Sequence, residues 1–168
     1  ISLTETTHIA QMVQDATDNF SPEYGHFKIK PHPTYSIKEV QSLLGLQETE
    51  NIEFVSGDFH DVIEKSNLLI SNSSSVCLES LAKGVPVIIV GSAIGVTQNP
   101  IPSQLAPEMW CEVHNATTLS ESVQRYNISR SDDRISFQVI GSKIRADYFN
   151  QVTIASVQNF VFGSSTDV

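Results

Sequence analysis

The stretch LLISNSSSVCLESLAKGVPVIIV, residues 68–90, decides the fold. It opens and closes with short, continuous apolar runs, which are typical of strands buried on both faces of a parallel sheet. Residues 73–83 between the two runs predict a helix, and Gly84 marks its end. A strand, a helix and a strand joined by short links form a right-handed βαβ unit. The first run therefore predicts a central parallel strand.

The alternation of strand and helix continues outward from this stretch. Strands are predicted at the end of Ile1–Leu3 and at His26–Lys30, Ile52–Val55, Asn67–Ser71, Val85–Val90 and Trp110–Val113. Helices are predicted over Thr6–Phe20, Ser36–Leu44, Phe59–Lys65, Ser73–Lys83, Leu119–Tyr126 and Asp132–Asn150, with a last apolar segment over Val152–Phe162. This order predicts an α/β fold: a Rossmann-like, doubly wound, mainly parallel sheet with helices on both faces, plus C-terminal helices.

The pattern changes from alternating to helical only at Asn127–Asp133. We therefore expect residues 1–126 to form a Rossmann-like domain and residues 127–168 to form a C-terminal helical extension of that domain. A chain of 168 residues is long enough for one domain with a single buried core.

Composition excludes several classes of function. The formal net charge of −9 disfavours broad binding to nucleic acid or to an anionic membrane, because both need a basic surface. No apolar run approaches the roughly 20 residues that span a bilayer, so we expect no transmembrane segment. The two cysteines, Cys77 and Cys111, have no metal-ligand spacing, and we predict no metal site and no cofactor.

Three polar segments follow predicted strands: Pro31–Thr34, Ser56–Asp58 and Asn72–Ser75. In open parallel α/β sheets, ligands bind outside the carboxyl ends of the strands. The run Ser73-Ser74-Ser75 opens a helix, where free N–H groups and the helix dipole favour a phosphate or carboxylate. The alternative is a simple N-cap, which needs only one serine. We interpret the serine run as a phosphate site.

Four further residues are candidates beside the serines. His32 lies between two prolines and can donate a hydrogen bond to a phosphate oxygen, with Lys30 nearby. Glu79 lies one helical turn beyond Ser75, where a carboxylate can accept both hydroxyls of a ribose; the alternative is a favourable charge near a helix N-terminus. Asp58 is a possible cleft residue, and helix capping explains it more simply.

Residues 74–88, SSVCLESLAKGVPVI, resemble the donor-binding segment of GT-B glycosyltransferases. Lys30-Pro31-His32-Pro33 resembles the His-Pro motif of bacterial transferases that use cytidine-nucleotide donors, and the capsule polysaccharide group is the most similar. The likeness covers roughly Phe27 to Gly91. It implies that His32, as the catalytic candidate, holds the donor phosphate together with the serines, and that Glu79 holds the ribose. Retaining GT-B families carry a second glutamate eight residues after the first. This sequence has Val87 at that position, which disfavours the retaining mechanism.

The resemblance implies the donor-binding half of a glycosyltransferase in surface polysaccharide biosynthesis. Its substrate would be a nucleotide-activated sugar, with CMP or CDP favoured and UDP second. The acceptor glycan would be held by an N-terminal domain that this chain lacks, and the location would be cytoplasmic or peripheral at the inner face of the membrane. The alternatives are an isomerase like the nucleotide-sugar 2-epimerases, a non-catalytic nucleotide- or sugar-binding module, and a receiver-like signalling domain. The last is disfavoured because it lacks the acidic pair expected after its first strand.

Overall fold

The computed structural model describes residues 3–17, 25–46, 48–127, 131–149 and 153–154. The strands are β1 (Phe27–Ile29), β2 (Ile52–Phe54), β3 (Leu69–Ser71), β4 (Val87–Val90) and β5 (Trp110–Val113). The helices are α1 (Leu3–Thr17), α2 (Ile37–Leu44), α3 (Phe59–Ile63), α4 (Val76–Ala82), α5 (Ala116–Asn127) and α6 (Ser131–Tyr148).

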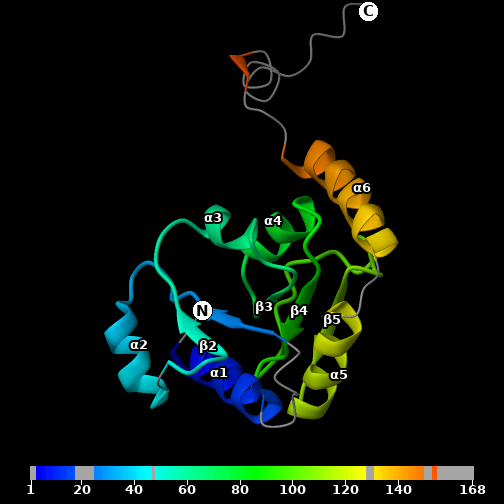
Figure 1. Ribbon diagram of the computed structural model, residues 1–168. Coiled ribbons are helices and arrows are strands. Elements are labelled where there is room, and N and C mark those ends of the chain that lie inside the picture. The colour runs from blue at the N-terminus through cyan, green and yellow to red at the C-terminus, as the bar shows by residue number, and fades with distance from the viewer. Residues whose placement is uncertain (1–2, 18–24, 47, 128–130, 150–152, 155–168) are drawn as a thin grey trace, which may run out of the picture.

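All strand pairs are parallel, and the predicted α/β class is confirmed. β1 pairs with β2, and a second sheet has the order β3-β4-β5. Helices α1, α2 and α5 lie on one side of the strands, and α3, α4 and α6 lie on the other (Figure 1). Phe27 of β1 packs against the hydrophobic clusters of both sheets. This layout is that of a Rossmann-like fold.

The prediction of a central strand at residues 67–71 is wrong. Among the described strands, β4 is central and β3 lies at the edge of its sheet. All four residues of β4 are fully buried, whereas Leu69 and Ile70 of β3 are half-buried. An apolar run predicts that a strand is largely buried, but it does not fix the order of strands in the sheet.

Several element boundaries also differ from the prediction. Leu3 is helical, so it does not end a strand, and α1 begins three residues earlier than expected. The predicted end of this helix at Phe20 and nearly all of the segment at 152–162 lie outside the described residues. The predicted helices at 36–44 and 119–126 agree with α2 and α5 in place, and the capping box of Ser36 and Glu39 fixes the start of α2.

Helix α6 packs on α4 through two glycines. Gly84 has a φ of +74° and ends α4, where the N–H of Val85 donates to the carbonyl of Ser80 and the N–H of Gly84 donates to that of Leu81. These bonds are the Schellman pattern of helix ends. A Cβ added to Gly141 of α6 would lie 2.5 Å from the Gly84 nitrogen, so the two backbones are in close contact.

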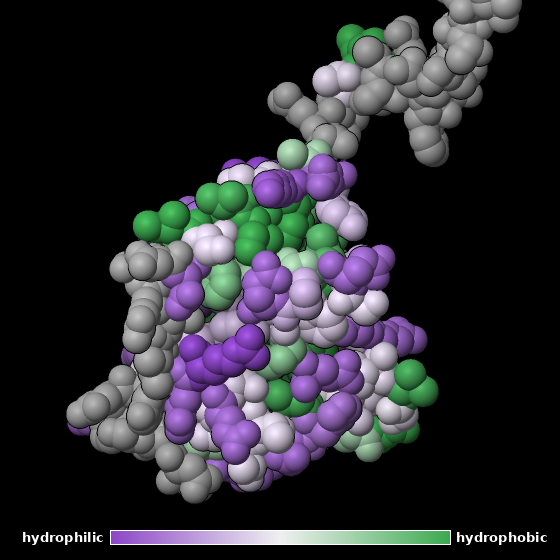
Figure 2. Space-filling model, turned by 90° about the vertical axis from the view of Figure 1, so that its right-hand side faces the viewer, coloured by the Kyte–Doolittle hydropathy of each residue, from purple (hydrophilic) through white to green (hydrophobic). Residues whose placement is uncertain are grey.

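The outer face of α6 is apolar in part. Ile135 and Val139 are 64% and 54% exposed. They are four residues apart and therefore share one face of the helix. Figure 2 shows hydrophobic side chains gathered towards the α6 end of this side of the molecule.

Candidate functional site

The serine run lies in a loop of residues 72–75, here called the serine loop. This loop is held in place by Asn72, which is 2% exposed. Its side-chain amide donates to the carbonyl of Val90 at 2.8 Å and to the carboxylate of Glu5 at 2.9 Å. Its side-chain oxygen accepts hydrogen bonds from both the N–H and the hydroxyl of Ser73. Asn72 therefore links the exit of β3 to the exit of β4 and to the first turn of α1.

None of the three serines caps helix α4 through its side chain. Ser75 occupies the N-cap position in a helical conformation and forms no side-chain cap bond. The hydroxyl of Ser73 donates to Asn72 at 2.6 Å. Within the described residues, the hydroxyls of Ser74 and Ser75 have no hydrogen-bond partner. The simple N-cap alternative for the serine run therefore fails, and two hydroxyl donors remain available to a ligand.

His32 lies in an exposed turn directly after β1. Its Nδ1 accepts a hydrogen bond from the backbone N–H of Thr34 at 3.3 Å and lies 2.8 Å from the Thr34 hydroxyl oxygen. An imidazole nitrogen that accepts from an N–H carries no proton, so in the neutral ring the proton lies on Nε2. The loop thus presents the Nε2–H of His32 as a donor.

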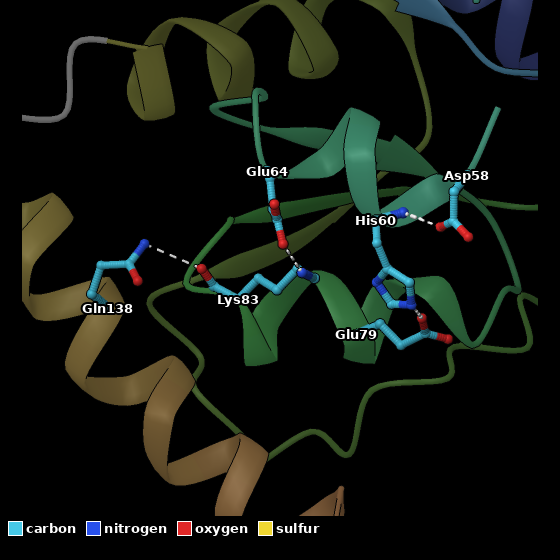
Figure 3. Close-up of polar contacts among 6 residues, drawn as sticks. All are labelled: Asp58, His60, Glu64, Glu79, Lys83 and Gln138. Carbon is cyan, nitrogen blue, oxygen red and sulfur yellow. Dashed lines mark hydrogen bonds and ion pairs between the residues drawn. The ribbon is translucent and has the colours of Figure 1, made fainter. Parts of the chain in front are cut away.

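Glu79 lies close to a histidine that the sequence did not point to. Its Oε2 lies 3.8 Å from Nε2 of His60 on α3, and the Glu79 side chain is 28% exposed. Asp58 accepts from the backbone N–H of His60 at 2.7 Å and caps α3 (Figure 3). Asp58 is thus a capping residue, as the simpler interpretation held. His60 was missed because only the packing of α3 beside α4 places it next to Glu79.

A second missed residue is Glu5 in the first turn of α1. Its carboxylate accepts from Asn72 and, at 2.7 Å, from the hydroxyl of Ser92 after β4. It therefore fixes the loops that leave β3 and β4. Glu5 is 67 positions from Asn72 in the sequence, and no local pattern could have linked the two.

Cys77 lies under the serine loop and has no exposed surface. Its thiol donates to the backbone carbonyl of Asn72 at 3.5 Å. Burial raises the pKa of Cys77 to about 11, so the thiol stays neutral at neutral pH and acts as an apolar packing group.

The structure brings only some of the predicted site residues together. Glu79 lies on α4, the helix that follows the serine loop, and His60 of α3 lies 3.8 Å from it. No hydrogen bond or ion pair in the described part of the chain connects His32 or Lys30 with the serines. His32, the serine run, Glu79 and Lys30 therefore remain predicted ligand residues. Across the described residues, no three His, Cys, Asp or Glu side chains are grouped so that they could hold a metal ion.

Comparison with known proteins gives one match. The family model described as "Putative glycosyltransferase (DUF6716)" matches residues 30–107, just under half of the chain. This segment contains every predicted ligand residue, from Lys30 to Glu79. No curated protein and no solved structure matches the chain.

No helix in the described residues combines the length and apolar character needed to cross a membrane. Residues 30–107 are thus similar to a glycosyltransferase-like domain, and they lie within the parallel α/β fold.

Proposed function

We propose that this chain is the donor-binding half of a glycosyltransferase in surface polysaccharide biosynthesis. Its donor is a nucleotide-activated sugar, with a cytidine nucleotide favoured over a uridine nucleotide. The family match supports the transferase class. The observation that carries the proposal is the start of α4, where Ser74 and Ser75 leave their hydroxyls free and Ser75 forms no cap.

The phosphate groups of the donor bind at the serine loop. The hydroxyls of Ser74 and Ser75 donate to phosphate oxygens, and the positive end of the α4 dipole adds a favourable field. Asn72 holds the loop in this shape before the donor arrives, so little ordering is required on binding. When the bond to the sugar breaks, the same donors stabilise the charge that develops on the leaving nucleotide.

His32 supplies a further donor from the loop after β1. Because its Nδ1 is occupied by Thr34, the ring directs one defined N–H to a phosphate oxygen. We assign His32 a hydrogen-bonding role in stabilising the leaving group.

Glu79 binds the ribose of the donor. The Glu79 carboxylate can accept hydrogen bonds from both ribose hydroxyls, and its Oε2 lies 3.8 Å from Nε2 of His60. The acceptor and the catalytic base belong to the rest of the transferase, since Asp58 is used as a helix cap. Transfer then requires the acceptor hydroxyl to be positioned next to the anomeric carbon.

The single substitutions Ser74→Ala and Ser75→Ala test the phosphate site. Calorimetric titration with CDP should show each single variant binding about tenfold more weakly, because each removes a hydrogen bond to a charged group. Ser73→Ala is the matched control, since its hydroxyl proton is already committed to Asn72, and its affinity should change less than twofold. Equal losses in all three variants, or no heat with CDP, CMP, UDP or UMP at millimolar concentration, would contradict the proposal.

A nucleotide that lacks the ribose hydroxyls tests the role of Glu79. Glu79→Gln should weaken CDP binding roughly tenfold, because it removes a charged acceptor from the ribose hydroxyls. The same variant should bind 2′,3′-dideoxy-CDP as well as the parent chain does, since that nucleotide lacks both hydroxyls. An equal loss for both nucleotides would show that Glu79 acts only through the structure of α4.

A further inference from the structure

A cavity lies at the opposite ends of the strands from the serine loop. It has a volume of about 390 Å³ and is bounded by the residues before β3 and β4, the end of α4 and one face of α6. Two of its lining residues, Asn67 and Pro86, come two residues before β3 and one residue before β4, respectively. The serine loop follows the carboxyl end of β3, so the two locations are separated by the length of the strand.

The charge of this cavity is opposite to that of the chain. Its ionisable lining residues are Lys83, Arg134, Arg145 and Glu64, which sum to +2, whereas the whole chain carries −9. Three of the ten lysines and arginines of the chain thus line one cavity. Such a concentration of cations in an acidic protein favours an anionic ligand.

Only one of these cations is neutralised by a direct ion pair. Lys83 Nζ lies 2.6 Å from Oε1 of Glu64 (Figure 3). That hydrogen bond and the Lys83 charge hold the pKa of Glu64 below its usual value, with smaller effects from His60 and Arg145. Within the described residues, Arg134 and Arg145 form neither an ion pair nor a side-chain hydrogen bond. Their guanidinium groups therefore remain available for bidentate contacts to phosphate or carboxylate.

The two arginines lie on one face of α6, and both line the cavity. They are eleven residues apart, about three helical turns and about 16 Å along the axis. Gln138 lies between them on the same face, and its amide donates to the carbonyl of Lys83 at 3.1 Å (Figure 3). This contact, and the packing of Gly141 against Gly84, hold the face of α6 that bears the arginines against the end of α4.

We propose that this cavity binds an elongated small anion with negative charge at both ends. Arg134 holds one end and Arg145 holds the other. The buried side chains of Phe137 and Val85 also line the cavity, so part of the ligand need not be charged. The ligand class is a linear polyphosphate or a short organic molecule with a phosphate or carboxylate at each end.

Linear tripolyphosphate and orthophosphate distinguish this proposal from simple charge attraction. The titration is followed by NMR at the backbone amide of Gly84 and the side-chain amide of Gln138, in a Ser74→Ala/Ser75→Ala background that removes the serine hydroxyl donors. Tripolyphosphate should bind at least tenfold more tightly than orthophosphate at equal ionic strength. Arg134→Gln and Arg145→Gln should each weaken tripolyphosphate binding about tenfold.

Lys143→Gln is the matched control, because Lys143 is exposed on the same helix and does not line the cavity. Its affinity should equal that of the parent chain. The proposal is overturned if Lys143→Gln weakens binding as much as the two arginine variants do, if orthophosphate binds as tightly as tripolyphosphate, or if neither shifts the two reporter amides.

Discussion

Replacing Asn72 with alanine is expected to lower the free energy of unfolding by about 3 kcal/mol. The substitution leaves the carbonyl of Val90, the N–H of Ser73 and one side of the Glu5 carboxylate without their partner in a buried region. Buried polar groups left unpaired cost more than the hydrogen bonds they had gained. For a chain of this size, the loss corresponds to a fall in melting temperature of roughly 6–12 °C.

Asn67→Ala provides the comparison for this experiment. Asn67 is exposed two residues before β3 begins, and its change should alter the melting temperature by less than about 2 °C. Thermal melts followed by circular dichroism measure both variants. If Asn72→Ala melted like Asn67→Ala, Asn72 would not hold the loops after β3 and β4 together.

Replacing Gly141 with alanine is expected to cost about 2–3 kcal/mol. The new Cβ would lie 2.5 Å from the Gly84 nitrogen, 2.7 Å from the Leu81 oxygen and 2.9 Å from the Gly84 Cα. All three are backbone atoms and cannot move aside as a flexible side chain can. Alanine is intrinsically better than glycine inside a helix by about 1 kcal/mol, so a measured loss can come only from this contact.

The same substitution at Gly95 is the control. A Cβ on Gly95 meets no atom within 4 Å, so Gly95→Ala should leave stability unchanged or slightly raised. Urea unfolding gives the free energy for both variants. A Gly141→Ala chain as stable as the parent would contradict the packing of α6 on α4, and with it the cavity that these helices enclose.

Local patterns were enough to predict much of the fold. The spacing of apolar residues and Gly45 lie within a few positions of each other, and they placed α2 correctly. The start of α4 was less predictable. The sequence suggested Ser73, but the side chain of Ser73 is bonded to Asn72, and the helix begins at Val76.

Long-range contacts limited prediction of the site. The sequence could suggest the serine run and Glu79, because both follow from the position of a strand and the helix after it. It could not suggest His60 or Glu5, since each meets its partner only after distant helices pack together. The close contact of Gly84 with Gly141 has the same origin, because a glycine in a helix does not reveal what lies opposite it.

The proposed donor site is tested most directly by amide shift mapping of the isotope-labelled chain with CDP. The account predicts that the largest shifts fall at Ser74, Ser75 and Val76, with smaller ones at Thr34 beside His32 and at Glu79. Shifts confined to Gly84 and the α6 face bearing Arg134 and Arg145 would contradict it, because CDP would then occupy the cavity between α4 and α6. The absence of any shift at saturating CDP would contradict nucleotide binding itself.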